Sequence, residues 1–123
     1  MEMQRYKKFL EQLKAVAEPN RLKILDLIIG GVQCNCNLGD SLNMKPNLIS
    51  HHISILEEAG FITLERDLVD ARWIYYSINK EELDEFNRLL SEFFDFNRVK
   101  PRIIQCGPLA REMFIDRIGV TSK

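Results

Sequence analysis

Apolar residues recur every three or four positions through the first half of the chain, which is the spacing of amphipathic helices. Proline, glycine and asparagine residues interrupt this pattern and divide it into separate helices. Pro19 and Pro46 suit the first turn of two of these helices, and Asn37 is expected to cap another. The predicted helices cover residues 3–18, 19–29, 38–43 and 46–59.

After Gly60 the apolar pattern takes the alternating period of a strand. Two segments rich in β-branched and aromatic residues, FITLER and RWIYYSI, flank the stretch DLVDA, and this arrangement predicts a β-hairpin. Residues 80–97 return to helical spacing with a stripe of leucine and phenylalanine. We expect this stripe to pack with the first helix, partly across a dimer interface, and a short helix over residues 109–118 to follow.

The order of these elements predicts a mainly α fold with a β-hairpin, the winged helix–turn–helix. The sequence NMKP supplies the tight turn between the third and fourth helices, and such a motif places its second helix in the major groove of DNA. We expect a homodimer formed through the first and last long helices. Residues 1–97 would form the DNA-binding and dimerisation domain, and residues 98–123 a C-terminal tail that carries Cys106.

The helix predicted over 46–59 has two different faces. Ile49, Ile53 and Leu56 are spaced by four and three, so they form the stripe that should be buried. The opposite face is small and polar, which suits an approach to base edges, where asparagine pairs with adenine and serine with several partners. The residues predicted to read DNA from this face are Asn47, Ser50, His51 and Ser54. Neighbouring residues on a helix point roughly 100° apart, so His52 is expected to be a packed, hydrogen-bonded side chain rather than a partner of His51 in a metal site.

Basic residues around this motif are candidates for phosphate contacts. Lys45 stands at the start of the reading helix, and Arg21 and Lys23 lie on the second helix. Arg66 and Arg72 flank the tip of the hairpin, the wing, from which they would reach phosphate or the minor groove.

Composition places few further limits on function. The chain has 123 residues, of which 46% are hydrophobic and 28% charged, as is ordinary for a globular protein. Its net charge is -1, so the overall charge gives no sign of nucleic-acid binding. The N-terminal segment holds no uninterrupted apolar run, so we expect a cytoplasmic protein without a signal peptide or membrane span. No hydrolytic triad, nucleotide loop or paired acid and base is present, so an enzyme is not expected.

Two of the three cysteines stand one residue apart, just before the third predicted helix. In an extended segment residues i and i+2 point the same way, so Cys34 and Cys36 should present both sulfurs to one point. The start of a helix favours thiolates, and paired thiolates select thiophilic ions. Trivalent arsenic and antimony prefer three sulfurs, and Cys106 could supply the third from the same chain or from the partner; a cellular thiol or water could also complete the site.

The chain resembles the ArsR/SmtB family of winged-helix metal-sensing repressors over about residues 10–80. The resemblance is carried by LKAVAEPNRLKILDLI, by CNCNLGDSLNMKPNLISHHISILEEAGFI and by RWIYYSI. It implies a homodimer that binds an imperfect inverted repeat in double-stranded operator DNA, and repression that is lifted when a ligand binds. The arsenic, cadmium and lead sensors of the family carry Cys-x-Cys-x-x-Cys at this helix start. Cys34 and Cys36 match its first two positions, and Gly39 stands at the third.

The wing of this chain departs from the family's pattern, because RDLVDAR contains no glycine and carries Asp67 and Asp70. The function expected is a repressor released from its operator when arsenite or antimonite binds Cys34, Cys36 and Cys106, with no organic cofactor. The ion would pull on the helix that braces the reading helix. The alternatives are a repressor that responds to thiol oxidation or to cadmium, lead or zinc, and a winged helix that binds a protein instead of DNA.

Overall fold

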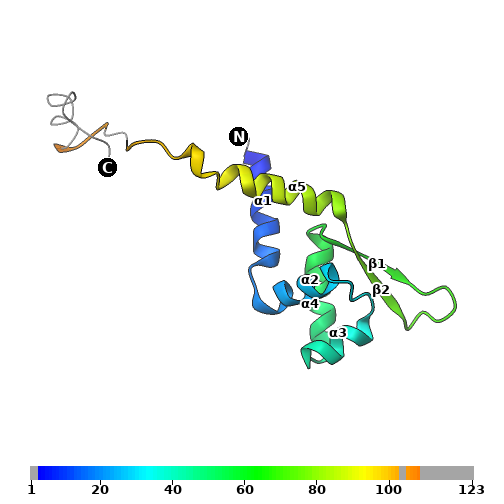
Figure 1. Cartoon of the computed structure of the whole chain (residues 1–123). Helices are drawn as coiled ribbons and strands as arrows, with labels where there is room; N and C mark the ends of the chain where they lie inside the picture. Colours follow the sequence, from blue (N-terminus) through cyan, green and yellow to red (C-terminus); the bar gives the residue numbers. More distant parts are fainter. Residues whose placement is uncertain (1–2, 103–104, 109–123) are drawn as a thin grey trace. The chain divides into compact units, whose positions relative to one another are not determined.

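The computed structural model describes residues 3–102 and 105–108 and shows five helices with a hairpin between the fourth and the fifth (Figure 1). The elements are α1 (Met3–Val16), α2 (Pro19–Ile29), α3 (Asn35–Leu42), α4 (Pro46–Glu58), β1 (Ile62–Arg66), β2 (Ile74–Ile78), α5 (Lys80–Phe93) and the 3-10 turn η1 (Phe96–Arg98). This order confirms the predicted winged helix–turn–helix. The chain divides into two units after Leu90, and the winged fold lies in the first.

Side chains from the helices and from the start of the hairpin meet in the core of the first unit. Phe61 and Leu56 are fully buried, and the rings of Phe61 and Phe86 meet edge to face with their centroids 5.2 Å apart. Phe86 also contacts Phe9, with centroids 5.7 Å apart. Each such buried side chain contributes about 1.5–3 kcal/mol to the stability of the fold, so α1, α5 and the start of β1 are held to one another.

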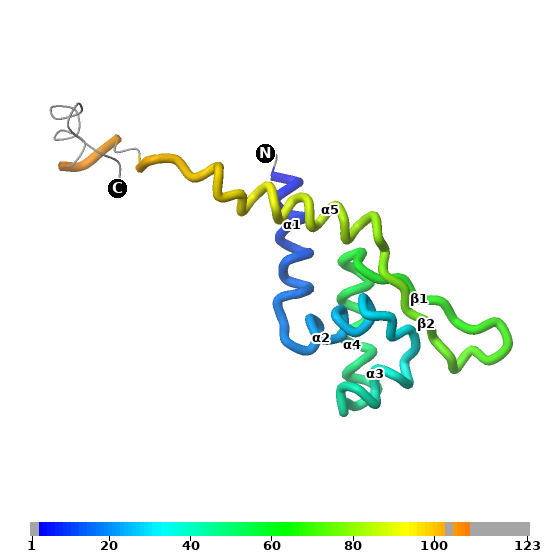
Figure 2. Tube along the Cα trace, in the orientation of Figure 1, coloured from blue at the N-terminus to red at the C-terminus, as the bar shows by residue number. Residues whose placement is uncertain are grey.

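The hairpin is joined to the segment that precedes α3. β1 and β2 pair antiparallel, with Leu64 opposite Tyr76 and Glu65 opposite Tyr75. Cys34 forms an isolated antiparallel bridge to Tyr75, and the Tyr76 N–H donates to the Gln33 carbonyl at 2.7 Å. One bridge and one backbone hydrogen bond therefore hold the segment between α2 and α3 beside β2 (Figure 2).

Several predicted boundaries were wrong. α3 begins at Asn35 instead of residue 38, so Asn37 lies inside the first turn and the helix cap is Cys34, whose backbone is extended. The bridge from Cys34 to Tyr75 explains this, because it holds the residue before the helix in a strand conformation. The last long helix ends at Phe93, followed by η1, instead of reaching residue 97. The helix predicted over 109–118 lies outside the described residues.

The turn between α3 and α4 uses an unusual backbone position. Asn43 has a φ of 51°, in the left-handed region where asparagine is tolerated better than most residues, and its N–H donates to the Gly39 carbonyl. This turn sets the angle between α3 and α4. Within the described part of the chain, every helix is too short or too polar to span a membrane.

Candidate functional site

The helix α4 turns its two faces as the sequence predicts. Ile49, Ile53 and Leu56 are buried, with exposed fractions of 4%, 3% and 0%. The residues predicted to read DNA or to contact phosphate at this helix are all exposed, namely Lys45, Asn47, Ser50, His51 and Ser54. Their contacts with DNA stay a prediction. Leu48, which sequence reasoning overlooked, is also exposed on this helix (43%) and offers an apolar contact for a thymine methyl group.

His52 is buried on the inner side of α4 and makes the hydrogen bond expected of a packed histidine. Its Nδ1 lies 3.2 Å from Arg21 Nη1. Because a guanidinium only donates hydrogen bonds, Nδ1 is the acceptor in this contact. Arg21 also donates to the carbonyls of Ala15, at 2.6 Å, and Lys14. The guanidinium predicted to contact phosphate is thus occupied in joining the end of α1 to α4.

The far end of α4 is held by a buried amide on α1. Gln12 is 1% exposed, and its Nε2 donates to the Ala59 carbonyl at 3.2 Å, where α4 ends. Among the described residues, its Oε1 has no hydrogen-bond partner. Together, Gln12 and the Arg21–His52 contact fix the reading helix against α1 and α2.

The wing is organised by its two carboxylates. Asp67 Oδ2 accepts from the N–H groups of Val69 and Asp70, both at 2.9 Å, and these bonds lower the pKa of Asp67. Asp70 forms an ion pair with Arg72, with 2.7 Å between Nη2 and Oδ2, and the guanidinium lowers the pKa of Asp70. Arg66 donates to the Ala71 carbonyl at 2.7 Å. Both arginines predicted to contact DNA are exposed, yet each already has a partner within the turn.

The two cysteine sulfurs before and within α3 lie 2.8 Å apart. They converge as predicted, but for a different reason. Cys34 is extended and caps the helix, whereas Cys36 is already helical. Cys34 is 8% exposed and Cys36 is exposed, so the pair opens to solvent on the Cys36 side. Cys34 Sγ also lies 2.7 Å from Asn37 Oδ1.

The two thiols have opposite acidities. The hydrogen bond from Cys36 lowers the pKa of Cys34, and the backbone N–H groups of Asn37 and Cys36 act in the same direction. The same hydrogen bond raises the pKa of Cys36, because its proton is shared with the neighbouring sulfur. The prediction of two low-pKa thiolates was therefore wrong for Cys36. The contact between the sulfurs therefore makes Cys34 the more acidic thiol of the pair.

The third predicted ligand, Cys106, is exposed and belongs to the second unit. Its part in a metal site stays a prediction, as does that of the thiol pair. In residues 3–102 and 105–108, no group of three or more histidine, cysteine, aspartate or glutamate side chains is placed to hold a metal ion.

A short helix, a turn, an exposed polar helix and a hairpin define the winged helix–turn–helix class of DNA-binding domains. The chain belongs to the ArsR family of bacterial regulatory proteins, whose family model matches residues 18–63. It is 36% identical to an arsenical resistance operon repressor of Bacillus subtilis, over 70% of this chain and 77% of that protein. It is 38% identical to the transcriptional repressor SdpR of the same organism, over 63% of this chain and 84% of that protein.

A solved structure supports the fold independently. A homodimeric winged helix–turn–helix DNA-binding domain of Mycobacterium bovis, described as a possible ArsR-family regulator, superposes with a TM-score of 0.58. The match covers 91% of this chain and 85% of that domain at 17% identity. Members of the ArsR family are DNA-binding regulators and not enzymes, so this chain is a transcriptional repressor of the ArsR type.

Proposed function

We propose that the chain is a homodimeric repressor that leaves its operator when trivalent arsenic or antimony binds Cys34 and Cys36, with Cys106 as the third sulfur. The observation that carries this proposal is the 2.8 Å separation of two sulfurs at the start of α3, the helix that braces α4. A relative named as an arsenical resistance operon repressor supports the choice of ligand. Since thiols persist in a reducing compartment that also holds DNA, we place the protein in the cytoplasm.

A shared ion would have to open the thiol pair. Metal–sulfur bonds are about 2.3 Å long, so two sulfurs on one ion lie roughly 3.5–3.8 Å apart. The pair at 2.8 Å must therefore widen by roughly 0.7–1 Å. Cys34 is attached to β2 and Cys36 is part of α3, so this widening shifts α3, β2 or both.

A shift of α3 would weaken the grip on DNA. The two reading helices of a dimer must lie about 34 Å apart to enter successive major grooves. A small rotation of each helix–turn–helix motif would change this distance, so that the two helices no longer fit successive grooves. A coupling of about 1–3 kcal/mol between ligand and DNA binding would weaken operator binding roughly 5- to 150-fold.

The dimer would form through α1 and α5. Met3 and Leu10 on α1 are 69% and 49% exposed, although both are apolar, and a partner helix would cover them. The homodimeric structural neighbour supports a dimeric assembly. A dimer with two-fold symmetry would read an imperfect inverted repeat, with the bases contacted by Asn47, Ser50, His51 and Ser54 and the phosphates by Lys45, Arg66 and Arg72.

A second candidate function is a redox response, because the two sulfurs lie 2.8 Å apart and the contact between them lowers the pKa of Cys34. Peroxide would oxidise two thiols to a disulfide and would itself be reduced to water. A bond between Cys34 and Cys36 would close a tight ring, so a partner such as Cys106 is the better choice.

An operator-binding assay separates the candidates. The intact protein is titrated onto a duplex from its own upstream region, with arsenite, with cadmium, or with peroxide. Release by arsenite alone supports the main proposal, and X-ray absorption would then count the sulfurs bound to arsenic. Release by cadmium alone or by peroxide alone would replace it with the corresponding alternative. A protein that binds no such duplex would instead point to a protein partner.

A further inference from the structure

We propose that Tyr75 and Asp67 connect the thiol pair to the wing, so that a ligand on Cys34 and Cys36 changes the conformation of the wing as well as the position of α3. The inference rests on the proposed function for its ligand. It adds a second path by which that ligand acts on DNA binding.

The first link is the main chain. Cys34 bridges Tyr75 in antiparallel register, and the next residue, Tyr76, is bonded to the Gln33 carbonyl at 2.7 Å. In an antiparallel pair, the side chains of directly opposite residues lie side by side on one face. The Tyr75 side chain is therefore a neighbour of the Cys34 side chain. A movement of Cys34 toward an ion is transmitted to β2 without passing through α3 or α4.

The second link is the Tyr75 hydroxyl. It donates to Asp67 Oδ1 at 3.2 Å. The other oxygen of the same carboxylate accepts the two N–H groups that shape the wing turn, those of Val69 and Asp70. One carboxylate thus joins the ring beside the thiol pair to the conformation of the turn. A shift of the Tyr75 ring either breaks its bond to Asp67 or moves the carboxylate and the turn with it.

The wing turn presents an unusual tip that such a shift would move. Leu68 and Val69 are fully exposed, at 101% and 95%, and they sit between the Asp67 cap and the Asp70–Arg72 ion pair. The carboxylates and guanidiniums of the turn balance one another in charge. The wing therefore depends on its shape more than on a net positive charge for any contact with DNA, and its shape is what Asp67 controls.

The side chain of Trp73 can report a change in the conformation of the wing. Trp73 is the single tryptophan. Its carbonyl accepts from the Asp67 N–H at 2.9 Å, and its N–H donates to the Asp70 carbonyl at 3.0 Å, so it closes the turn. The side chain is 44% exposed, and its fluorescence will respond to a change in the turn.

The test uses the full chain without DNA. Arsenite is titrated while its binding is followed by the ultraviolet absorption of arsenic–sulfur bonds and the wing by Trp73 fluorescence. In the wild type, the fluorescence should change with the same midpoint as binding. In Tyr75→Phe, which keeps the ring and removes only the hydroxyl, binding should stay within about twofold because the thiols are unchanged, while most of the fluorescence change disappears. Asp67→Asn should behave in the same way.

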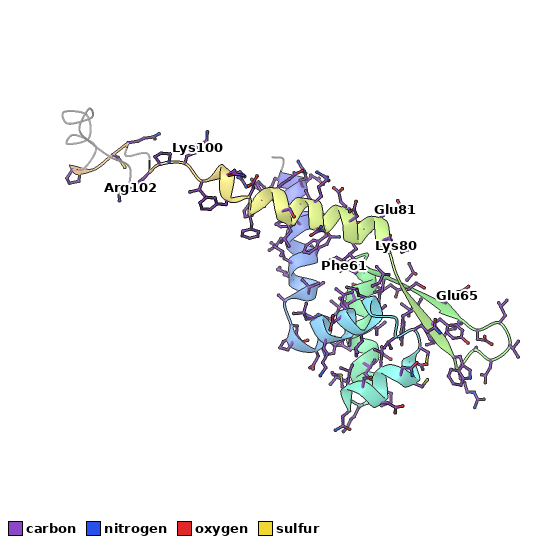
Figure 3. All side chains as sticks on the ribbon, in the orientation of Figure 1. Phe61, Glu65, Lys80, Glu81, Lys100 and Arg102 are labelled. Atoms are coloured by element: carbon purple, nitrogen blue, oxygen red, sulfur yellow. The ribbon has the colours of Figure 1, made fainter. Side chains whose placement is uncertain are left out.

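The matched control is Glu65→Gln. Glu65, which is labelled in Figure 3, lies on β1 and pairs with Tyr75 in the strand register, and the substitution also replaces a hairpin carboxylate by an amide. It should respond as the wild type does. A full fluorescence change in Tyr75→Phe, or bound arsenite without any change in the wild type, would overturn the inference.

A second arm does not depend on arsenite. In a Cys106→Ser background, iodoacetamide places a carboxamidomethyl group on one sulfur of the pair, and the added group forces the two sulfurs apart. The inference requires a change of Trp73 fluorescence that Tyr75→Phe removes. A protein that binds no arsenite but shows this change would refute the proposed ligand and keep the link to the wing. If the modified protein shows no change, the link is absent.

Discussion

Cys36→Ser is expected to separate operator binding from operator release. Cys36 is exposed and its contribution to the fold is its hydrogen bond to Cys34, which a serine hydroxyl also donates. Exposed substitutions of this kind usually change stability by less than about 0.5 kcal/mol, so operator affinity without ligand should stay within about twofold of the wild type.

The response to arsenite should be lost, for a reason that the geometry supplies. Release depends on drawing two sulfurs that lie 2.8 Å apart onto one ion. With a single sulfur at the start of α3, the ion no longer pushes β2 and α3 apart, and the coupling of about 1–3 kcal/mol falls toward zero. Arsenite should then weaken operator binding less than about twofold, against roughly 5- to 150-fold in the wild type.

The assay is fluorescence anisotropy of a labelled operator duplex, titrated with protein at fixed salt with and without arsenite. Salt must be constant because phosphate contacts make the affinity strongly dependent on ionic strength. If Cys36→Ser is released as strongly as the wild type, the thiol pair is not the sensor. If it no longer binds the operator without arsenite, Cys36 has a structural role that its exposure does not suggest.

Further predictions follow from the same site. Cys106→Ser should weaken arsenite affinity, measured by direct titration, while leaving partial release; unchanged affinity would remove Cys106 from the site. Ser50→Ala or His51→Ala should each cost about 1–3 kcal/mol of operator affinity if these residues read bases, and an unchanged anisotropy curve would mean that α4 is oriented differently on DNA. Arsenite affinity should fall as pH rises above the lowered pKa of Cys34, by up to about tenfold per unit. Above that pKa the thiol no longer brings the proton with which the hydroxide on arsenic leaves as water. Cadmium should show the opposite trend, since it displaces protons from thiols.

The helices and the reading face could be predicted because their signals are local. Ile49, Ile53 and Leu56 show the buried stripe of α4 in the spacing alone, and the same spacing leaves Ser50 and His51 outside. The start of α3 could not be predicted in this way. Cysteine is an uncommon helix cap, and Cys34 holds this position because it bridges a strand that lies far along the sequence.

The conformation of the wing turn could have been predicted from the sequence. Aspartate readily accepts hydrogen bonds from backbone N–H groups two and three residues ahead, so DLVD itself signals that Asp67 shapes a turn. The ion pair between Asp70 and Arg72 likewise follows from their proximity in the sequence. The first effect of these charges is on the turn that carries them, ahead of any effect on DNA. The bond from Tyr75 to Asp67 depended on hairpin register, which the sequence left undetermined.

The attachments of α4 decide which elements a ligand at the thiol pair is able to move. Gln12 fixes its C-terminal end and Arg21 holds it through the buried His52, so α4 moves only together with α1 and α2. Among the described residues, the wing is held through Asp67 and through its strand pairing, and Cys34 is bonded to that same strand. Because a perturbation moves the least restrained neighbour first, the wing and α3 should yield before the reading helix does. Release of DNA would then begin at the wing. The distance between the two reading helices would change only later, when α4 moves together with α1 and α2.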